Sequence, residues 1–225
     1  MAFRVVIIGG TGQVGAAVVR ALTNEPSCTE VVMVNRRETP EPANPCVRQV
    51  VLDTSAPGFA DQVAALVRDV AAHGDPVHGA SCVGVGQGSM QWSEEDLKAL
   101  EIGVVGGFAR GCYAAGVRHF ALLSAAGSSS SSRIRYSRVM GMKEEAIQAI
   151  GFTRLALFRP GIIAGNAHTP PYLAWLGRLI PGAVGTIDQD QIGRAFAAEF
   201  ANPSTDGGVV TFDNGAMRRM AATAR

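Results

Sequence analysis

Two kinds of hydrophobic pattern alternate along the chain. Short apolar runs, several of them rich in Val, are typical of strands buried on both faces of a parallel sheet. They predict strands at residues 3–8, 30–35, 47–52, 77–83, 118–124, 153–158 and 209–212. Between the runs, apolar residues recur every three or four positions, which is the period of a helix with one buried face. This period predicts helices that begin near residues 13, 57, 93, 134, 170 and 189, and one more at the C-terminus.

The alternation of strands and helices predicts an α/β fold. Such an order forms a doubly wound parallel sheet, in which right-handed crossovers place helices on both faces. The 225 residues are expected to form a single domain, residues 1–225. The period changes after residue 160, where we expect a small substrate cap at about 162–187 with apolar and aromatic lining candidates.

Three glycines follow the first predicted strand directly. Gly9, Gly12 and Gly15 have the spacing G-x-x-G-x-x-G within FRVVIIGGTGQVG. One glycine permits the sharp bend, one lets the backbone approach a pyrophosphate, and one lets the helix pack close to the strand. The diphosphate would bind the free N–H groups of a helix that starts near Gln13. A turn without phosphate is the alternative, and the strand–turn–helix context favours a dinucleotide-binding Rossmann fold.

The ends of the second and third strands bear on the choice of dinucleotide. An NAD site needs an acidic residue after the second strand, but this chain has Asn35, Arg36 and Arg37 there. A guanidinium can bind a 2′-phosphate, so we expect NADP(H) rather than NAD(H), unless the arginines only solvate the loop. Asp53, followed by Thr54, is placed to contact the adenine or, alternatively, to cap the next helix.

Composition and charge exclude several partners. A net charge of +1 gives no reason to expect nucleic acid or an anionic membrane surface. The apolar runs are too short to span a bilayer and the N-terminus lacks a signal-peptide pattern, so we expect a soluble, cytoplasmic protein. The four cysteines show no C-x-x-C spacing, so neither a metal site nor a disulfide framework is expected.

Several segments resemble the short-chain dehydrogenase/reductase superfamily. They are LLSAAG at 122–127, Tyr136 and FRPGII at 158–163, combined with the glycine motif. The chain looks like the atypical branch that includes the Tat-interacting-protein-like oxidoreductases and the relatives of the sugar epimerases. The resemblance implies a homodimer through the helices at 93–115 and 134–150. It also implies that a tyrosine exchanges the substrate proton and that a serine hydrogen-bonds the carbonyl oxygen. These residues are Tyr136 and Ser124 in this chain.

The resemblance also implies a lysine four residues after the tyrosine, and this chain has Met140 there. An ammonium about 5 Å from the phenol would favour the phenolate by roughly 3 kcal/mol, which methionine does not supply. Lys143 follows Tyr136 by seven residues and returns to nearly the same helical face, about 10 Å along the axis. Its long side chain could reach back toward the tyrosine. The alternative is a solvated lysine beside Glu144 and Glu145.

Other candidate positions lie at strand ends. Cys82 and Gly84 end the fourth strand, where they would pass close to the ribose and nicotinamide, or be plain core and backbone positions. The resemblance adds Pro160 after the sixth strand. The complete expected cofactor site comprises Gly9, Thr11, Gly12, Gln13, Val14, Gly15, Asn35, Arg36, Arg37, Asp53, Thr54, Cys82, Val83, Gly84 and Pro160. The serine run at 128–132 either supplies a hydroxyl or forms a mobile loop, and its composition favours the loop.

Two functions remain open. The first is reduction of a small or hydrophobic carbonyl compound by NADPH, with Tyr136 protonating the oxygen, Ser124 orienting it, and Lys143 as a third catalytic candidate. The second is a catalytically weak NADP(H)-binding regulator or partner-binding protein, because Met140 replaces the expected lysine.

Overall fold

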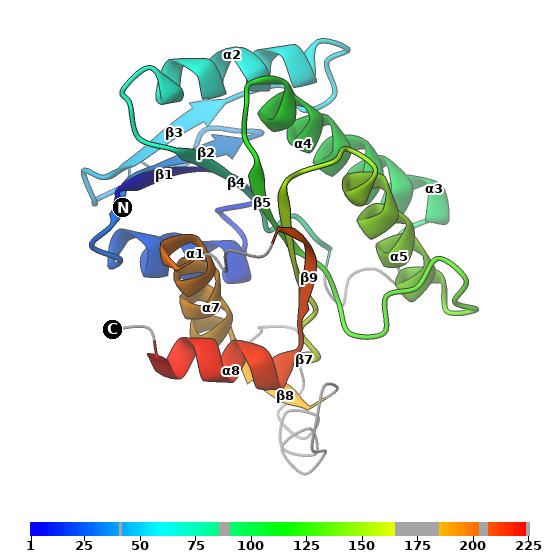
Figure 1. Ribbon diagram of the computed structural model, residues 1–225. Helices are drawn as coiled ribbons and strands as arrows, with labels where there is room; N and C mark the ends of the chain where they lie inside the picture. The colour runs from blue at the N-terminus through cyan, green and yellow to red at the C-terminus, as the bar shows by residue number, and fades with distance from the viewer. Residues whose placement is uncertain (41, 86–90, 165–184, 203–206, 224–225) are drawn as a thin grey trace.

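The computed structural model describes the chain except residues 41, 86–90, 165–184, 203–206 and 224–225. Its centre is a sheet in the order β3-β2-β1-β4-β5-β6-β9, in which every neighbouring pair is parallel (Figure 1). The strands are β1 (Phe3–Ile8), β2 (Cys28–Asn35), β3 (Val47–Val51), β4 (Val77–Ser81), β5 (His119–Leu123), β6 (Arg154–Phe158) and β9 (Gly208–Phe212). This order confirms the doubly wound α/β fold.

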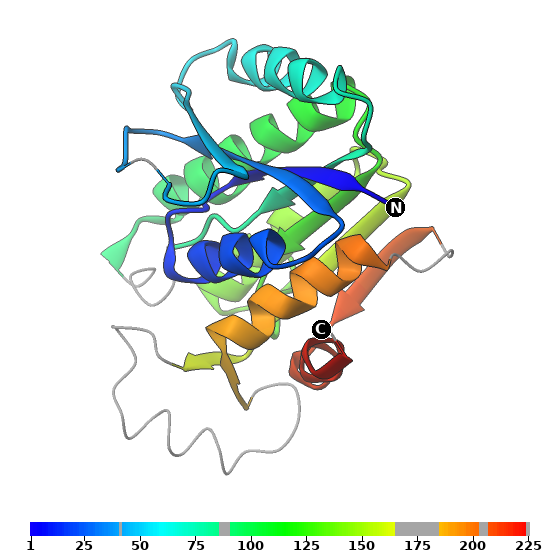
Figure 2. The same cartoon turned by 90° about the vertical axis from the view of Figure 1, so that its left-hand side faces the viewer.

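Helices cover both faces of the sheet, as the alternation predicts. One face carries α1 (Gln13–Thr23), α7 (Gln189–Ala201) and α8 (Asn214–Thr223), and α1 and α7 lie side by side in both views (Figures 1 and 2). The other face carries α2 (Phe59–Ala71), α4 (Val105–Ala114) and α5 (Arg135–Gln148). The two faces bury separate apolar cores, which is the reason the strands read as continuous hydrophobic runs.

The helix expected at 93–115 is divided into three parts. Ser93 caps α3 (Glu94–Lys98) by accepting a hydrogen bond from the N–H of Asp96 at 3.0 Å, as the sequence predicts. A π-helix (Ala99–Val104) then leads into α4. A π-helical segment within a helix rotates the side chains that follow it about the helix axis, and such segments are frequent at functional sites. Here the segment places Glu101 in the interior, where it is fully buried.

The region after β6 differs from the expectation in part. A second, two-stranded parallel sheet forms from β7 (Ile162–Ala164) and β8 (Thr186–Asp188), which the hydrophobic pattern did not predict because each strand has three residues. Most of the expected substrate cap at 162–187, including the helix near 170, lies outside the described residues. None of the helices in the described part of the chain combines the length and apolarity needed to cross a bilayer.

Candidate functional site

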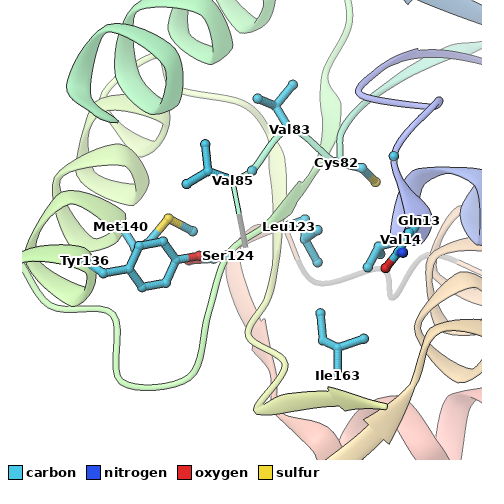
Figure 3. Close-up of a pocket in the computed structure, with 12 residues that line it drawn as sticks. Gln13, Val14, Cys82, Val83, Val85, Leu123, Ser124, Tyr136, Met140 and Ile163 are labelled. Carbon is cyan, nitrogen blue, oxygen red and sulfur yellow. The ribbon is translucent and has the colours of Figure 1, made fainter. Parts of the chain in front are cut away.

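A pocket of about 290 Å³ opens at the carboxyl ends of the central strands (Figure 3). It lies at the edge where doubly wound sheets bind their ligands. Its walls come from the glycine turn, the end of β4, the end of β5, α5 and β7. The lining residues are Gly12, Gln13, Val14, Cys82, Val83, Gly84, Val85, Leu123, Ser124, Tyr136, Met140 and Ile163. The structure therefore brings together segments that the sequence singled out far apart along the chain.

The glycine turn has the shape that a diphosphate requires. Gly9 has φ +80°, and a Cβ there would lie 2.6 Å from the backbone nitrogen of Val83. A Cβ on Gly15 would lie 2.0 Å from the carbonyl oxygen of Gly9, so only glycine permits this close approach of helix and strand. Gly12 caps α1 without a side-chain hydrogen bond, which leaves the first N–H groups of the helix available. These features fit a dinucleotide.

The adenosine end of the expected site lies outside the pocket lining. Arg36 and Arg37 are exposed, whereas the Asn35 side chain is buried and donates to Oε1 of Gln49 at 3.0 Å. The Oδ1 of Asp53 accepts hydrogen bonds from the hydroxyl and N–H of Ser55, and these bonds lower the pKa of the Asp53 carboxyl. Asp53 therefore caps a turn. The alternative that it caps the next helix is wrong, because α2 begins at Phe59 after Gly58.

Pro160 does not line the pocket. It is buried, and its carbonyl oxygen accepts a hydrogen bond of 2.8 Å from the N–H of Ala126. The bond ties the segment after β5 to the segment after β6. Ile163, three residues further along in β7, lines the pocket instead. Sequence reasoning missed Ile163 because the short strand that positions it gave no periodic signal.

Tyr136 and Met140 lie on consecutive turns of α5 and face the pocket. The Tyr136 hydroxyl points into the pocket, and the Met140 side chain lies beside the tyrosine in the same wall (Figure 3). Burial of the ring raises the pKa of Tyr136 above its ordinary value, and the carboxylate of Glu101 raises that pKa further. The tyrosine is therefore a neutral phenol across the physiological pH range.

Lys143 is fully buried, so the expectation of a solvated lysine is wrong. Its Nζ donates to Oε2 of Glu101 at 2.8 Å and to the carbonyl oxygen of Leu123 at 3.0 Å. The ion pair lies behind the pocket wall, and neither Lys143 nor Glu101 is among the residues that line the pocket. The charge that acts on Tyr136 is thus the carboxylate of Glu101. An acidic residue inside the otherwise apolar segment ALEIGVVGGFA was the available sequence signal for Glu101.

Ser124 directly follows β5 and is held by a second ion pair, in which Glu144 is buried and Arg159 is partly exposed. Its Oγ donates to Oε1 of Glu144, and the same carboxylate oxygen accepts a hydrogen bond of 2.8 Å from Nε of Arg159. Arg159 also donates through Nη2 to the other carboxylate oxygen of Glu144. Sequence reasoning treated Glu144 as part of a solvated face, whereas it is buried behind Ser124.

The serine run packs against α5. The Ser128 side chain is buried, with its Oγ 3.1 Å from that of Ser124, and the N–H of Ser129 donates to the carbonyl oxygen of Ser137 at 3.0 Å. A Cβ on Gly141 would lie 2.2 Å from the backbone of Ser129, so a glycine in α5 allows this close packing. The run is therefore a docked segment that extends the Ser124 network.

Comparisons with known proteins agree with this architecture, although no family model matches the chain. The curated relatives include the protein fmp52-1, mitochondrial, of Aspergillus terreus, which is 31% identical over 189 residues covering 81% of this chain and 76% of the relative. The protein fmp52, mitochondrial, of Emericella nidulans is 27% identical over 186 residues covering the same shares of the two chains.

Solved structures show the same fold at low sequence identity. The oxidoreductase ylbE from Lactococcus lactis has a TM-score of 0.70 and 14% identity, with 99% of this chain and 98% of that chain covered. The UDP-glucuronic acid 4-epimerase from Bacillus cereus, solved with UDP-glucuronic acid and NAD, has a TM-score of 0.67 and 12% identity, with coverages of 93% and 77%. The chain thus shares the Rossmann architecture of NAD-dependent epimerases and oxidoreductases.

The expectation of a cytoplasmic protein is wrong on this comparison. Relatives that match most of this chain are named as mitochondrial proteins in several fungi. The expectation rested on short apolar runs and the lack of a secretory signal pattern. Those features do not distinguish between compartments inside the cell.

Proposed function

The chain belongs to the family of the Fmp52 proteins, and from this premise we propose that it is an NADP(H)-dependent oxidoreductase of the atypical short-chain dehydrogenase/reductase type. We propose further that it reduces a small or hydrophobic carbonyl compound and works as a homodimer in mitochondria, where the names of its relatives place them. One observation carries the proposal: the glycine turn, Ser124 and Tyr136 border a single pocket.

In this proposal, some segments of the chain bind the cofactor and Tyr136 transfers the proton. The glycine turn and the N-terminus of α1 would hold the diphosphate, Arg36 and Arg37 the 2′-phosphate, and the end of β4 the nicotinamide ribose. The bound cofactor would supply a hydride to the carbonyl carbon. Tyr136 would donate its phenolic proton to the carbonyl oxygen, and apolar side chains including Val85 and Ile163 would exclude water.

The state of Tyr136 favours reduction over oxidation. A phenol whose pKa lies above its ordinary value of about 10 remains protonated at neutral pH. It can therefore give a proton to the strongly basic oxygen that forms when a carbonyl is reduced. Oxidation of an alcohol needs the phenolate as a base, and this form is scarce beside the Glu101 carboxylate. A protonated Tyr136 therefore supports carbonyl reduction at neutral pH.

Substitution of Met140 by lysine should shift the pH dependence of turnover. The introduced ammonium favours the phenolate of Tyr136, so the alkaline loss of reductase activity should move to lower pH by about two pH units. Alcohol oxidation should rise over the same range. The matched control is Met142→Lys, because Met142 lies on another face of α5 and outside the pocket. Identical pH profiles for Met140→Lys and the unmodified protein would contradict the charge argument.

Removal of both arginines after β2 should weaken the binding of NADPH but not that of NADH. Loss of charge-assisted hydrogen bonds to the 2′-phosphate is expected to raise the KM for NADPH about 10- to 100-fold, with the KM for NADH unchanged. The variant is Arg36→Ala combined with Arg37→Ala, and Arg68→Ala at the exposed end of α2 is the control. An equal change in the KM for NADPH and for NADH would show that the arginines do not bind the 2′-phosphate and only solvate the loop.

The direct test is NADPH oxidation by the purified protein across aldehydes, ketones and quinones, with cofactor binding measured in parallel by fluorescence titration. Turnover of at least one carbonyl compound is expected. Binding of NADPH without turnover of any compound would instead support the second candidate, a cofactor-binding regulator. The observation that favours this candidate is the neutral Met140 beside a tyrosine whose pKa is raised.

A further inference from the structure

Ser124 is fixed by polar groups that the proposed reaction does not use. Its hydroxyl donates a hydrogen bond to the carboxylate of Glu144, and Arg159 donates to both oxygens of that carboxylate. Ser124 and Glu144 are each 5% exposed. A carboxylate held by two hydrogen bonds from one guanidinium is fixed in its orientation. The hydrogen bond from Ser124 to Glu144 is therefore a fixed feature of the pocket wall.

A serine hydroxyl carries one proton, and in this arrangement the proton points away from the pocket. The neighbouring Ser128 donates its own proton to the carbonyl oxygen of Ala125 at 2.7 Å, with its Oγ 3.1 Å from that of Ser124. The Ser124 proton stays on the bond to Glu144, and the hydroxyl keeps a lone pair for a ligand. Toward the pocket, Ser124 is a hydrogen-bond acceptor.

Tyr136 has the opposite character. Its hydroxyl points into the same pocket (Figure 3). Among the described residues, none accepts a hydrogen bond from it. The pocket thus offers one phenolic donor from α5 and one hydroxyl acceptor from the end of β5, with apolar side chains around them. A ligand that satisfies both must carry an acceptor and a donor on neighbouring atoms.

We propose that the Glu144–Arg159 pair makes Ser124 an acceptor, and that the pocket thereby selects carbonyl compounds with a hydroxyl group on the carbon next to the carbonyl. This inference rests on the proposed function. Tyr136 meets the carbonyl oxygen, and the adjacent hydroxyl donates to Oγ of Ser124. A ketone without that hydroxyl leaves the remaining lone pair of Ser124 without a donor beside apolar side chains, and an unpaired polar group at a binding site discriminates against the ligand that fails to pair it. Glu144 and Arg159 are positioning residues, because they act through Ser124.

Three matched ketones test this assignment: α-hydroxyacetophenone, α-methoxyacetophenone and acetophenone. All three share the same carbonyl group and differ only in the substituent on the adjacent carbon. The hydroxyl substituent can donate and accept a hydrogen bond, the methoxy substituent can only accept one, and acetophenone has no polar substituent there. For the unmodified protein, kcat/KM should be about 10- to 100-fold higher for the hydroxyl compound than for the other two. Calorimetric titration of the protein with each ketone, in the presence of NADP⁺, should show the same order in Kd.

Variants separate a specificity role from a structural one. Glu144→Ala frees the Ser124 proton to point into the pocket, so the preference for the hydroxyl compound over the methoxy compound should disappear. Ser124→Ala should remove the same preference. Glu145→Ala is the matched control, because Glu145 is exposed, contacts Ser130, and should leave the preference unchanged. A change in folding alone would lower the rates for all three ketones without changing their ratio.

The outcomes distinguish this inference from the proposed function. Turnover of the ketones with equal kcat/KM and equal Kd for the hydroxyl and methoxy compounds would overturn the Ser124 assignment and leave the reductase standing. No turnover, with the hydroxyl compound still bound about tenfold more tightly, would overturn the reductase and support Ser124 as an acceptor. Absence of binding by all three ketones would overturn the assignment.

Discussion

Replacement of Tyr136 by phenylalanine is expected to lower the rate of carbonyl reduction about 100- to 10,000-fold. The ring stays in the pocket wall, but the hydroxyl that points into the pocket is lost. The carbonyl oxygen then lacks its proton donor, since the Ser124 hydroxyl donates its hydrogen bond to Glu144. Steady-state kinetics with NADPH and a carbonyl substrate measure this effect, and fluorescence titration should show unchanged NADPH affinity.

Tyr113 provides the matched control for this substitution. It lies in α4, where its ring packs against Phe152 with centroids 5.5 Å apart and beneath the guanidinium of Arg118. Tyr113→Phe removes the same atom outside the pocket, so turnover should stay unchanged. Retention of turnover in Tyr136→Phe would remove Tyr136 from the mechanism, and water or another group would have to supply the proton.

Replacement of Lys143 by methionine should destabilise the protein by about 3–5 kcal/mol, because it leaves a buried carboxylate without its counter-charge. Glu101 and Lys143 are both 0% exposed, and Oε1 of Glu101 already lacks a hydrogen-bond partner among the described residues. Loss of Lys143 would leave the second oxygen unpaired as well. Urea unfolding followed by circular dichroism measures the change in the free energy of unfolding.

Two further variants show whether the pair or the lysine alone matters. The double variant Lys143→Met with Glu101→Leu removes both charges, and it should recover most of the lost stability, since apolar pairs often replace buried ion pairs at little cost. Lys98→Met is the surface control, because Lys98 forms an exposed pair with Glu94 and should leave the unfolding midpoint nearly unchanged. Equal destabilisation by the single and double variants would indicate that packing, rather than charge, dominates at Lys143.

The hydrophobic pattern alone predicts most of the fold. Each short apolar run predicted as a strand contributes a strand to the central sheet, and the helix predicted at 189–201 has the bounds of α7. Such runs have few other ways to bury both faces, and Gly9 and Gly15 occupy positions that no other residue fits. Segments with short or mixed signals were missed, namely the two-stranded sheet and the π-helical segment inside the helix at 93–115.

The candidate site was predictable in part, and its electrostatics were not. The glycine turn and the end of β4 follow from position relative to predicted strands, whereas Tyr136 and Ser124 follow from the family resemblance. The sequence also determined that Met140 stands where the resemblance implies lysine. Only the tertiary structure determined which partners the charged residues of α5 bind. Consecutive residues of a helix point about 100° apart, so neighbours in sequence contact different, distant segments. Lys143 donates a hydrogen bond to Glu101, 42 positions away, and Glu144 accepts hydrogen bonds from Ser124 and Arg159. Burial then turned side chains that look solvated in the sequence into fixed parts of the pocket wall.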